Sequence, residues 1–401
     1  MEGWRREDVV RALYRVVLGR EAESEAVVAA HAARYEAPEG LIRTLFDSEE
    51  ARERQRREAL LRRMAAAEPG PLRVLLFGAY GNGNLGDAEQ AKAVATLLRG
   101  AVARPLEFGA CSFIDARPYG FPDGRVMPAE VVADPLALAA WDLLLVGGGG
   151  LFATPHWPLM EPGWAPMLRT IGLAYGLVGV GVGRGLREDP RHGPIWDALL
   201  AGAAFRSARD GLSLGAAPEA LWMPDPVLLA GLRSGGGQPR PPVPGGRPLI
   251  ILKQAVHAEE ARFLDWVEAE GAGCDVVAME RWREGELASR FPGLRFAEGV
   301  EELGRMCEAA SVVVSARYHG CIAALLSGVP CLGAGPGKIP ALFEALGARD
   351  QAIDGHGGLR ERLAAPPAPL EPGRFAPLRA AGEVALAALG RVMEGLPRRL
   401  G

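Results

Sequence analysis

The sequence predicts an α/β fold in two similar halves, preceded by a small all-α domain. Short apolar runs alternate with helical patterns from residue 72 to about residue 356, which is typical of parallel sheets wrapped by helices. A run dense in glycine and proline, 234–248, divides this region and indicates a flexible linker. We therefore expect four units, which are residues 1–66, 72–233, 248–356 and a tail with a helix at 357–401.

The first unit shows helical periodicity. Val9, Leu13 and Val16 follow helical spacing, as do later apolar residues. The Arg/Glu-rich stretch Glu49–Met64 is expected to be a solvated connecting helix. His31 is the one histidine of this unit and stands on a helix of mixed character, so we favour a docking or oligomerisation module over a catalytic domain.

The two halves contain the expected alternation of strands and helices. In the first half we predict strands at Leu72–Phe77, Leu143–Val146 and Leu177–Val182, and a helix at Asp87–Leu98. In the second half we predict strands at Leu249–Leu252, Asp275–Ala278, Val312–Val314 and around Cys331, with helices at Glu259–Glu268, Glu301–Ala309 and Cys321–Leu326 and one opening at Lys338. A final helix, Leu378–Met393, is expected to pack back across the first half.

The composition of the chain argues against several classes of protein. The net charge of −4 gives no strong attraction to nucleic acid or to an anionic membrane. Five scattered cysteines form neither a disulfide framework nor a metal-binding spacing, and Cys307 and Cys321 fit apolar helical patterns as core residues. No apolar run is long enough to span a bilayer. We expect a cytoplasmic protein, with a peripheral position at the inner membrane left open.

The most informative stretch is SARYHG, in which a basic residue and a histidine follow a buried strand. Arg317 and His319 would stand at the carboxyl end of a parallel sheet, where such sheets bind ligands. Lys338, one of only three lysines, opens a helix after the next strand. Two cations beside one imidazole are suited to an anionic substrate that gains or loses a proton.

A glycine-rich turn, GAYGNGNLGDAEQ, follows the first strand. Gly81 and its neighbours would let the backbone approach a ligand, and Asn84 and Asp87 would lie at the start of the next helix. The alternative is that Asp87 acts only as an N-cap and Asn84 only as a turn residue. The glycine spacing differs from the dinucleotide-binding fingerprint.

Two more glycine-rich turns occur in the first half. Gly148 and Gly149 belong to four consecutive glycines after a buried strand, where a ligand or an opposing backbone must come close. Arg184 follows the third turn and is a candidate anion ligand. Arg209 and Asp225 are expected to hold the floor of a cleft between the halves through charge-assisted hydrogen bonds.

A set of motifs, taken in order along the chain, resembles the polysaccharide pyruvyl transferase family. These motifs are YGNGNLGD, GGGGLF, GVGVG, ARD, PDP, SARYHG and SGVP with the later lysine. The resemblance implies two Rossmann-like halves in a GT-B-like arrangement. It also implies phosphoenolpyruvate as the donor and a sugar of a bacterial surface polysaccharide, free or lipid-linked, as the acceptor of a cyclic pyruvate ketal. The N-terminal LYRVVLGREAESEAV resembles a helical domain attached to bacterial surface-glycan proteins.

The resemblance assigns His319 as the acid/base, and Arg317, Lys338 and Arg184 as ligands of phosphoenolpyruvate. We expect neither a metal nor another cofactor to be required. Two alternatives remain open at this stage. One is a nucleotide-sugar glycosyltransferase of the same architecture, and the other is a non-catalytic glycan-binding protein that docks to an assembly complex through its helical domain.

Overall fold

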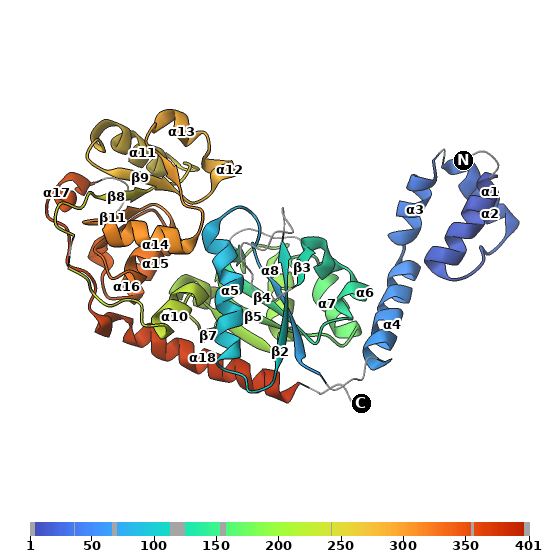
Figure 1. Cartoon of the computed structure of the whole chain (residues 1–401). Helices are drawn as coiled ribbons and strands as arrows, with labels where there is room; N and C mark the ends of the chain where they lie inside the picture. The colour runs from blue at the N-terminus through green and yellow to red at the C-terminus, as the bar shows by residue number, and fades with distance from the viewer. Residues whose placement is uncertain are drawn as a thin grey trace.

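The computed structural model describes residues 5–35, 37–65, 70–112, 125–152, 158–241, 243–353 and 357–396. Two parallel sheets, each wrapped by helices, form the body of the molecule, and a helical bundle precedes them (Figure 1). The strand orders are β3-β2-β1-β4-β5-β6-β7 and β10-β9-β8-β11-β12-β13. In each sheet the chain begins in the middle, moves to one edge and then crosses to the other, as in Rossmann folds. The predicted fold class is therefore confirmed.

The first sheet is buried on both faces. In β1, Leu72, Val74 and Leu76 face one hydrophobic cluster, while Leu75 and Phe77 face another. This is why the strand is apolar at every position except Arg73. The strands are β1 (Leu72–Phe77), β2 (Leu106–Ser112), β3 (Arg125–Pro128), β4 (Leu143–Phe152), β5 (Ala174–Val182), β6 (Phe205–Ala208) and β7 (Leu221–Trp222).

Helices cover both faces of this sheet. One face carries α5 (Leu85–Arg99), α10 (Pro226–Arg233) and α18 (Ala376–Gly395). The other face carries α6 (Pro135–Leu138), α7 (Trp164–Thr170) and α8 (Gly193–Gly202), and the short helix α9 (Gly211–Ala216) follows β6.

The second sheet repeats this layering. Val313 and Val314 of β11 point into different clusters, as residues next to each other on a strand must. Its strands are β8 (Leu249–Ile251), β9 (Asp275–Ala278), β10 (Arg295–Phe296), β11 (Val313–Ser315), β12 (Cys331–Ala334) and β13 (Ala352–Ile353). Its helices are α11 (Ala258–Glu270), α12 (Arg281–Glu284), α13 (Leu287–Arg290), α14 (Val300–Ala309), α15 (Tyr318–Leu326), α16 (Lys338–Ala345) and α17 (Leu359–Ala364).

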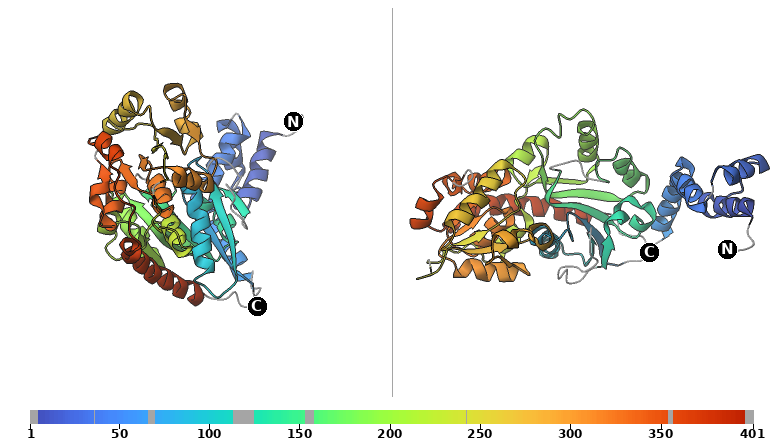
Figure 2. Two further views of the ribbon diagram at one scale, coloured as in Figure 1. Left: turned by 60° about the vertical axis from the view of Figure 1, so that its left-hand side comes forward. Right: turned by 90° about the horizontal axis from the view of Figure 1, so that it is seen from above.

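The two halves are in contact. Leu85 and Leu228 of the first half belong to the same hydrophobic cluster as Ile322 of the second. The amide of Leu85 also donates to the carbonyl of Met279 across the interface, at 3.4 Å. In Figures 1 and 2, α18 runs beneath the body and returns to the first half, as predicted, where Leu389 is fully buried. The arrangement is GT-B-like, with two Rossmann-like halves facing each other.

The N-terminal bundle stands away from this body (Figures 1 and 2). It is built from α1 (Arg6–Leu13), a π-helical turn (Tyr14–Leu18), α2 (Glu25–Arg34) and α3 (Pro38–Phe46) around its own apolar cluster. The connecting helix α4 (Glu49–Ala65) differs from the prediction of a fully solvated connector. Ala59 is fully buried in the core of the first half, where α4 packs against α6 and α7. Its small side chain lets an otherwise charged helix dock.

Candidate active site between the two halves

The sequence-predicted residues follow the carboxyl ends of strands in both sheets. Arg184 follows β5, Arg209 follows β6, and Asp225 begins α10 after β7. In the second half the turn after β11 carries Arg317 and His319, as expected for ligand-binding positions in parallel sheets.

His319 is held by residues of the opposite half. Its Nε2 lies 2.9 Å from Gln90 Nε2 on α5 and 3.5 Å from Asp225 Oδ2. Gln90 in turn donates to Asp225 Oδ2 at 2.7 Å. The other edge of the ring, with Nδ1, lies against Gly86, where a Cβ would come within 2.0 Å of Nδ1. The predicted acid/base group is therefore buried where the two halves meet.

Asp225 is ionised in this setting. Burial alone would raise the pKa of its carboxyl, but His319, Arg209 and the hydrogen bond from Gln90 outweigh that effect and hold the pKa below its usual value. Its other oxygen, Oδ1, accepts from the amide of Val227 at 3.0 Å and caps α10. Asp225 thus caps α10 with one carboxylate oxygen and faces His319 with the other.

Two cations lie against the ring of Tyr318, the residue before His319. The guanidinium carbon of Arg209 is 4.9 Å from the ring centroid, and Lys338 Nζ is 5.5 Å from it. Arg209 is 7% exposed and bonds Asp210 Oδ2 through Nε at 3.1 Å, while its buried Nη1 has no hydrogen-bond partner among the described residues. Such an unpaired buried donor is costly unless a ligand satisfies it.

Lys338 has neither a hydrogen bond nor an ion pair with any residue that the structure describes. Its side chain keeps contact with solvent, but protein atoms surround its ammonium. This partial desolvation, with repulsion from Arg209, lowers the pKa of Lys338 to about 8. The proximity of two positive charges marks the Arg209–Lys338 pair as an anion site.

Arg317 has different surroundings from those predicted. Its Nε donates to Glu284 at 2.8 Å, and its Nη2 donates to Glu280 at 2.7 Å and also to Glu284. Both carboxylates are buried, and burial raises the pKa of Glu284 even though Arg317 opposes the rise. These bonds use Nε and Nη2, so a donor-binding role for Arg317 would fall to Nη1, which bonds no described residue.

The N-cap of α5 is Asn84 and not Asp87. Asn84 is the N-cap and accepts from the amide of Gly86 at 3.0 Å, whereas Asp87 stands in the first turn. Asp87 accepts from Asn82 Nδ2 at 2.9 Å. Gly81 has φ +70°, a conformation that favours glycine.

The glycines of β4 are explained by close neighbours. A Cβ on Gly148 would stand 2.4 Å from Gln90 Oε1, so this glycine makes room for the side chain that meets His319. A Cβ on Gly149 would stand 3.4 Å from Asp87 Oδ1. Both have positive φ, at +70° and +92°. The groups that come close to these two glycines are therefore side chains of the protein, Gln90 and Asp87.

Arg184 lines a pocket of about 480 Å³ that joins the two halves. It and Leu212 come from the first half, while the turn Gly335–Gly337 before Lys338 and the carboxylates Glu259 and Glu344 come from the second. Arg184 is exposed and makes no ion pair with a described residue. The pocket therefore reaches the turn that precedes Lys338.

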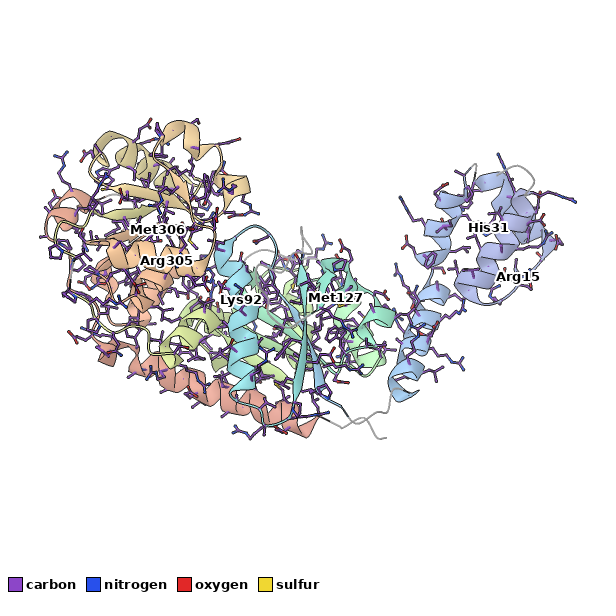
Figure 3. All side chains as sticks on the ribbon, viewed as in Figure 1. Arg15, His31, Lys92, Met127, Arg305 and Met306 are labelled. Carbon is purple, nitrogen blue, oxygen red and sulfur yellow. The ribbon has the colours of Figure 1, made fainter. Side chains whose placement is uncertain are left out.

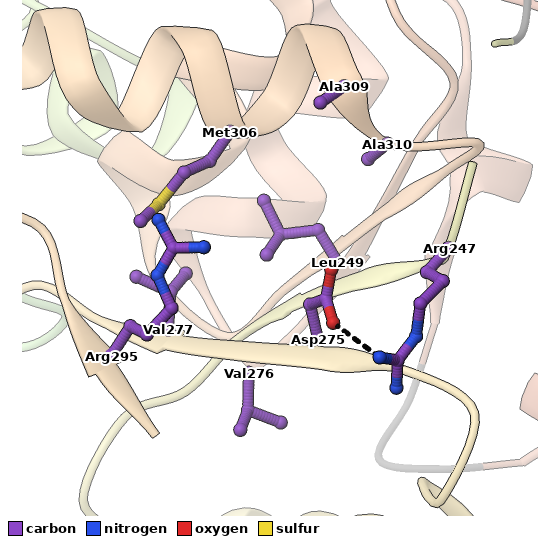
Figure 4. A pocket seen from close by; sticks show the side chains of 9 residues that line it. All are labelled: Arg247, Leu249, Asp275, Val276, Val277, Arg295, Met306, Ala309 and Ala310. Carbon is purple, nitrogen blue, oxygen red and sulfur yellow. Dashed lines mark ion pairs between the residues drawn. The ribbon is translucent and has the colours of Figure 1, made fainter. Parts of the chain in front are cut away.

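A second pocket, of about 70 Å³, lies elsewhere (Figure 4). Leu249 and Asp275, the first residues of β8 and β9, line it, so it is at the opposite edge of the sheet from His319. Asp275 is paired with Arg247 at 3.1 Å. His31 is also remote from the site, in the N-terminal bundle (Figure 3).

Sequence reasoning missed Gln90, Tyr318, Glu280 and Glu284. Tyr318 could have been singled out, because an aromatic residue beside Arg317 and His319 is placed to contact a cation. No local signal marks Gln90, which is 229 residues from its partner His319. Within the described ranges there is no group of three or more His, Cys, Asp or Glu residues able to hold a metal, and no helix is long and apolar enough to cross a membrane.

No curated protein sequence matches the chain at a significant level. Among solved structures, UDP-GlcNAc 2-epimerase from Methanocaldococcus jannaschii is similar, with 10% identity, a TM-score of 0.48, and coverage of 78% of this chain and 98% of that one. The glycotransferase of kitacinnamycin is similar with 15% identity, a TM-score of 0.44, and coverage of 83% and 100%. UDP-GlcNAc 2-epimerase from Neisseria meningitidis is similar with 10% identity, a TM-score of 0.44, and coverage of 82% and 96%.

The sequence pattern of one family covers more than half of the chain. It is that of polysaccharide pyruvyl transferases, and it matches residues 84–336. The match begins at the N-cap of α5 and ends at the turn before Lys338, so it spans both halves of the site. The chain therefore belongs to the polysaccharide pyruvyl transferase family.

Proposed function

We propose that this transferase moves the pyruvyl group of phosphoenolpyruvate onto a sugar of a bacterial surface polysaccharide, where it forms a cyclic ketal. The observation that carries the proposal is the Arg209–Lys338 pair, two cations that both lie over the ring of Tyr318. Phosphoenolpyruvate carries a phosphate and a carboxylate, and their desolvation requires fixed cations. The acid/base His319 is the next residue after Tyr318, beside these cations.

The reaction begins with a proton transfer. Nδ1–H of protonated His319 gives its proton to the methylene carbon of the enol phosphate, and the π electrons form the new C–H bond. A sugar hydroxyl then adds to the cationic carbon, and the neutral ring takes up the hydroxyl proton. Phosphate leaves with the electron pair of the broken C–O bond. A second hydroxyl closes the ring on the same carbon, and its proton passes to the departing phosphate. No oxidation or reduction occurs, and the products are the ketal and inorganic phosphate.

The cations act by binding charge. Arg209 is rigid, since it lies against Gly181 and bonds Asp210, and its unpaired Nη1 is available to an anion. Lys338 supplies a point charge over the ring of Tyr318. We propose Arg184 as the third cation, since it lines the pocket that opens beside Lys338.

The acceptor sugar is proposed to enter through that same pocket. Its volume of about 480 Å³ lies within the range of about 300–1,000 Å³ typical of small-molecule sites. Glu259 and Glu344 can accept hydrogen bonds from sugar hydroxyls, and the pocket contains residues of both halves. An open entrance suits a sugar that is part of a longer chain.

The proposal is tested by turnover. The purified protein is incubated with ¹³C-labelled phosphoenolpyruvate and a preparation of bacterial surface polysaccharide, and NMR follows the label while inorganic phosphate is assayed. We expect phosphate release that depends on the polysaccharide, and a new methyl signal from the ketal. Consumption of a nucleotide sugar in place of phosphoenolpyruvate would overturn the proposal and favour a glycosyltransferase. Binding without consumption of either donor would favour a glycan-binding protein.

A further inference from the structure

A fully buried polar pair in the first half faces the catalytic histidine of the second half. Gln90 and Asp225 are 0% and 1% exposed, and His319 is 9% exposed. The Gln90 amide lies between the other two, 2.7 Å from Asp225 Oδ2 and 2.9 Å from His319 Nε2. Helix capping explains only one oxygen of Asp225, because Oδ1 bonds the amide of Val227 while Oδ2 faces Gln90 and the imidazole.

We infer that Asp225, together with Gln90, is a positioning residue for His319, and that contact between the halves completes the acid/base group. This inference rests on the proposed function, since it names the groups that orient the proton donor of that reaction. A carboxylate that binds one nitrogen of an imidazole orients the ring and stabilises its protonated form. Here the bound nitrogen is Nε2, so Nδ1 is the nitrogen left to exchange protons with a substrate.

Gly86 fixes where the ring of His319 packs against the first half. The Nδ1 edge of the ring lies at the first turn of α5, where a Cβ on residue 86 would stand 2.0 Å from Nδ1. Only a glycine at this position lets the ring come so close to α5. Gly148 makes the same kind of room for Gln90, because a Cβ there would stand 2.4 Å from Gln90 Oε1. Two glycine-rich turns of the first half are thus shaped around the Asp225–Gln90–His319 contact.

Several charged or titratable groups surround the ring. Asp225 approaches it from the start of α10, Glu89 interacts with it electrostatically from α5, and Arg209 interacts electrostatically with Asp225. Tyr318 contacts it edge-on, with ring centroids 5.4 Å apart. Asp225 is the one of these with a carboxylate oxygen facing Nε2 at 3.5 Å, so its charge is expected to dominate.

The test uses Asp225→Asn in the full chain. Asparagine caps helices as well as aspartate does, so this variant keeps the bond to Val227. It removes the negative charge and replaces the oxygen that accepts from Gln90 by an amide nitrogen. Asp134→Asn is the matched control, since Asp134 caps α6 in the same way, through Leu136 at 2.8 Å, away from His319. Gln90→Met is a second variant that removes the bridging amide, and it keeps the test open if Asp225→Asn does not fold.

Two measurements are made on each variant. The first is turnover of phosphoenolpyruvate, for which we expect at least a tenfold loss in Asp225→Asn, a smaller loss in Gln90→Met, and none in Asp134→Asn, with affinity for phosphoenolpyruvate within twofold throughout. The second is ¹⁵N NMR of the ring nitrogens as a function of pH in protein labelled at its six histidines, with His319→Gln to assign the signal. We expect the His319 signal to change at a lower pH in Asp225→Asn, because an amide does not stabilise the imidazolium.

The outcomes separate this inference from the proposed function. Unchanged turnover in a folded Asp225→Asn protein, or a His319 signal that changes at the same pH as in the wild type, would overturn the positioning role. A wild-type protein that does not consume phosphoenolpyruvate would overturn the proposed function, while the NMR measurement would still decide whether Asp225 controls the ring.

Discussion

The two halves contribute different kinds of groups to the site. The first half supplies Gln90, Arg209 and Asp225, which are at most 7% exposed and fixed by hydrogen bonds. The second half supplies His319, whose ring reaches into the first half, and Lys338, whose ammonium has no described partner. The first half therefore acts as a preorganised frame, and the second brings the groups that change protonation. Enzymes that hold fixed charges in advance avoid reorganisation during the reaction.

Replacing His319 should have the largest effect on turnover. His319→Ala is expected to lower turnover by about 10²–10⁴-fold, the usual contribution of a general acid/base, while leaving the affinity for phosphoenolpyruvate mostly intact. Steady-state kinetics and calorimetry on the same preparation measure the two quantities. Equal activity in the variant would assign His319 a structural role and remove the distinction between the halves.

Arg317 should matter for folding more than for binding. Arg317→Ala leaves Glu280 and Glu284 buried without their cation, and removing one partner of a buried ion pair costs about 3–5 kcal/mol of unfolding free energy. Denaturant unfolding measures this loss. A variant that is as stable as the wild type but binds phosphoenolpyruvate more weakly would show that Arg317 is a donor ligand, as the sequence alone predicts.

Lys338 should make donor binding depend on pH. Its pKa of about 8 means that the ammonium is charged at pH 7 and loses its proton as the pH rises through 8. The affinity for phosphoenolpyruvate should therefore fall by about tenfold or more between pH 7 and pH 9.5, the scale of one hydrogen bond to a charged group. Lys338→Met should bind weakly with little pH dependence. A wild-type affinity that stays constant over this range would contradict the assignment.

The N-terminal helical domain should have no effect on the chemistry. A chain beginning at Pro71 loses the contact of Ala59 with α6 and α7, so its melting temperature should fall, whereas its affinity for phosphoenolpyruvate should remain within twofold. We propose protein docking as the role of this domain. A folded but non-binding truncated protein would show that the domain belongs to the site.

Local patterns predicted the fold well. Leu72–Phe77 and Asp275–Ala278 were predicted with the observed bounds, because most of their residues are apolar and β-branched or bulky, as in buried strands. The limits of other elements depend on contacts that a pattern does not contain. α5 begins at Leu85, before the predicted start, because Asn84 caps it, and β4 continues through its glycines to Phe152 because β5 pairs with it along that length.

The site was only partly predictable. His319 and Lys338 were found because each follows a strand in a short motif, and Arg209 was assigned to the floor of the cleft. The partners of Arg317 lie 33 and 37 residues away in the sequence, so nothing near Arg317 indicates that its charge is already neutralised. The pairing of Arg209 with Lys338 likewise depends on how the two halves meet.

The central claim is that phosphoenolpyruvate binds between Arg209 and Lys338, and calorimetry on Arg209→Ala tests it most directly. Arg206→Ala is the matched control, since Arg206 lies on β6, the strand that Arg209 follows, and pairs with the exposed Glu219 at 2.6 Å. We expect Arg209→Ala to weaken binding by about 1.5–3 kcal/mol, the scale of a hydrogen bond to a charged group, and Arg206→Ala to leave it unchanged. Wild-type affinity for phosphoenolpyruvate in a folded Arg209→Ala protein would contradict the claim.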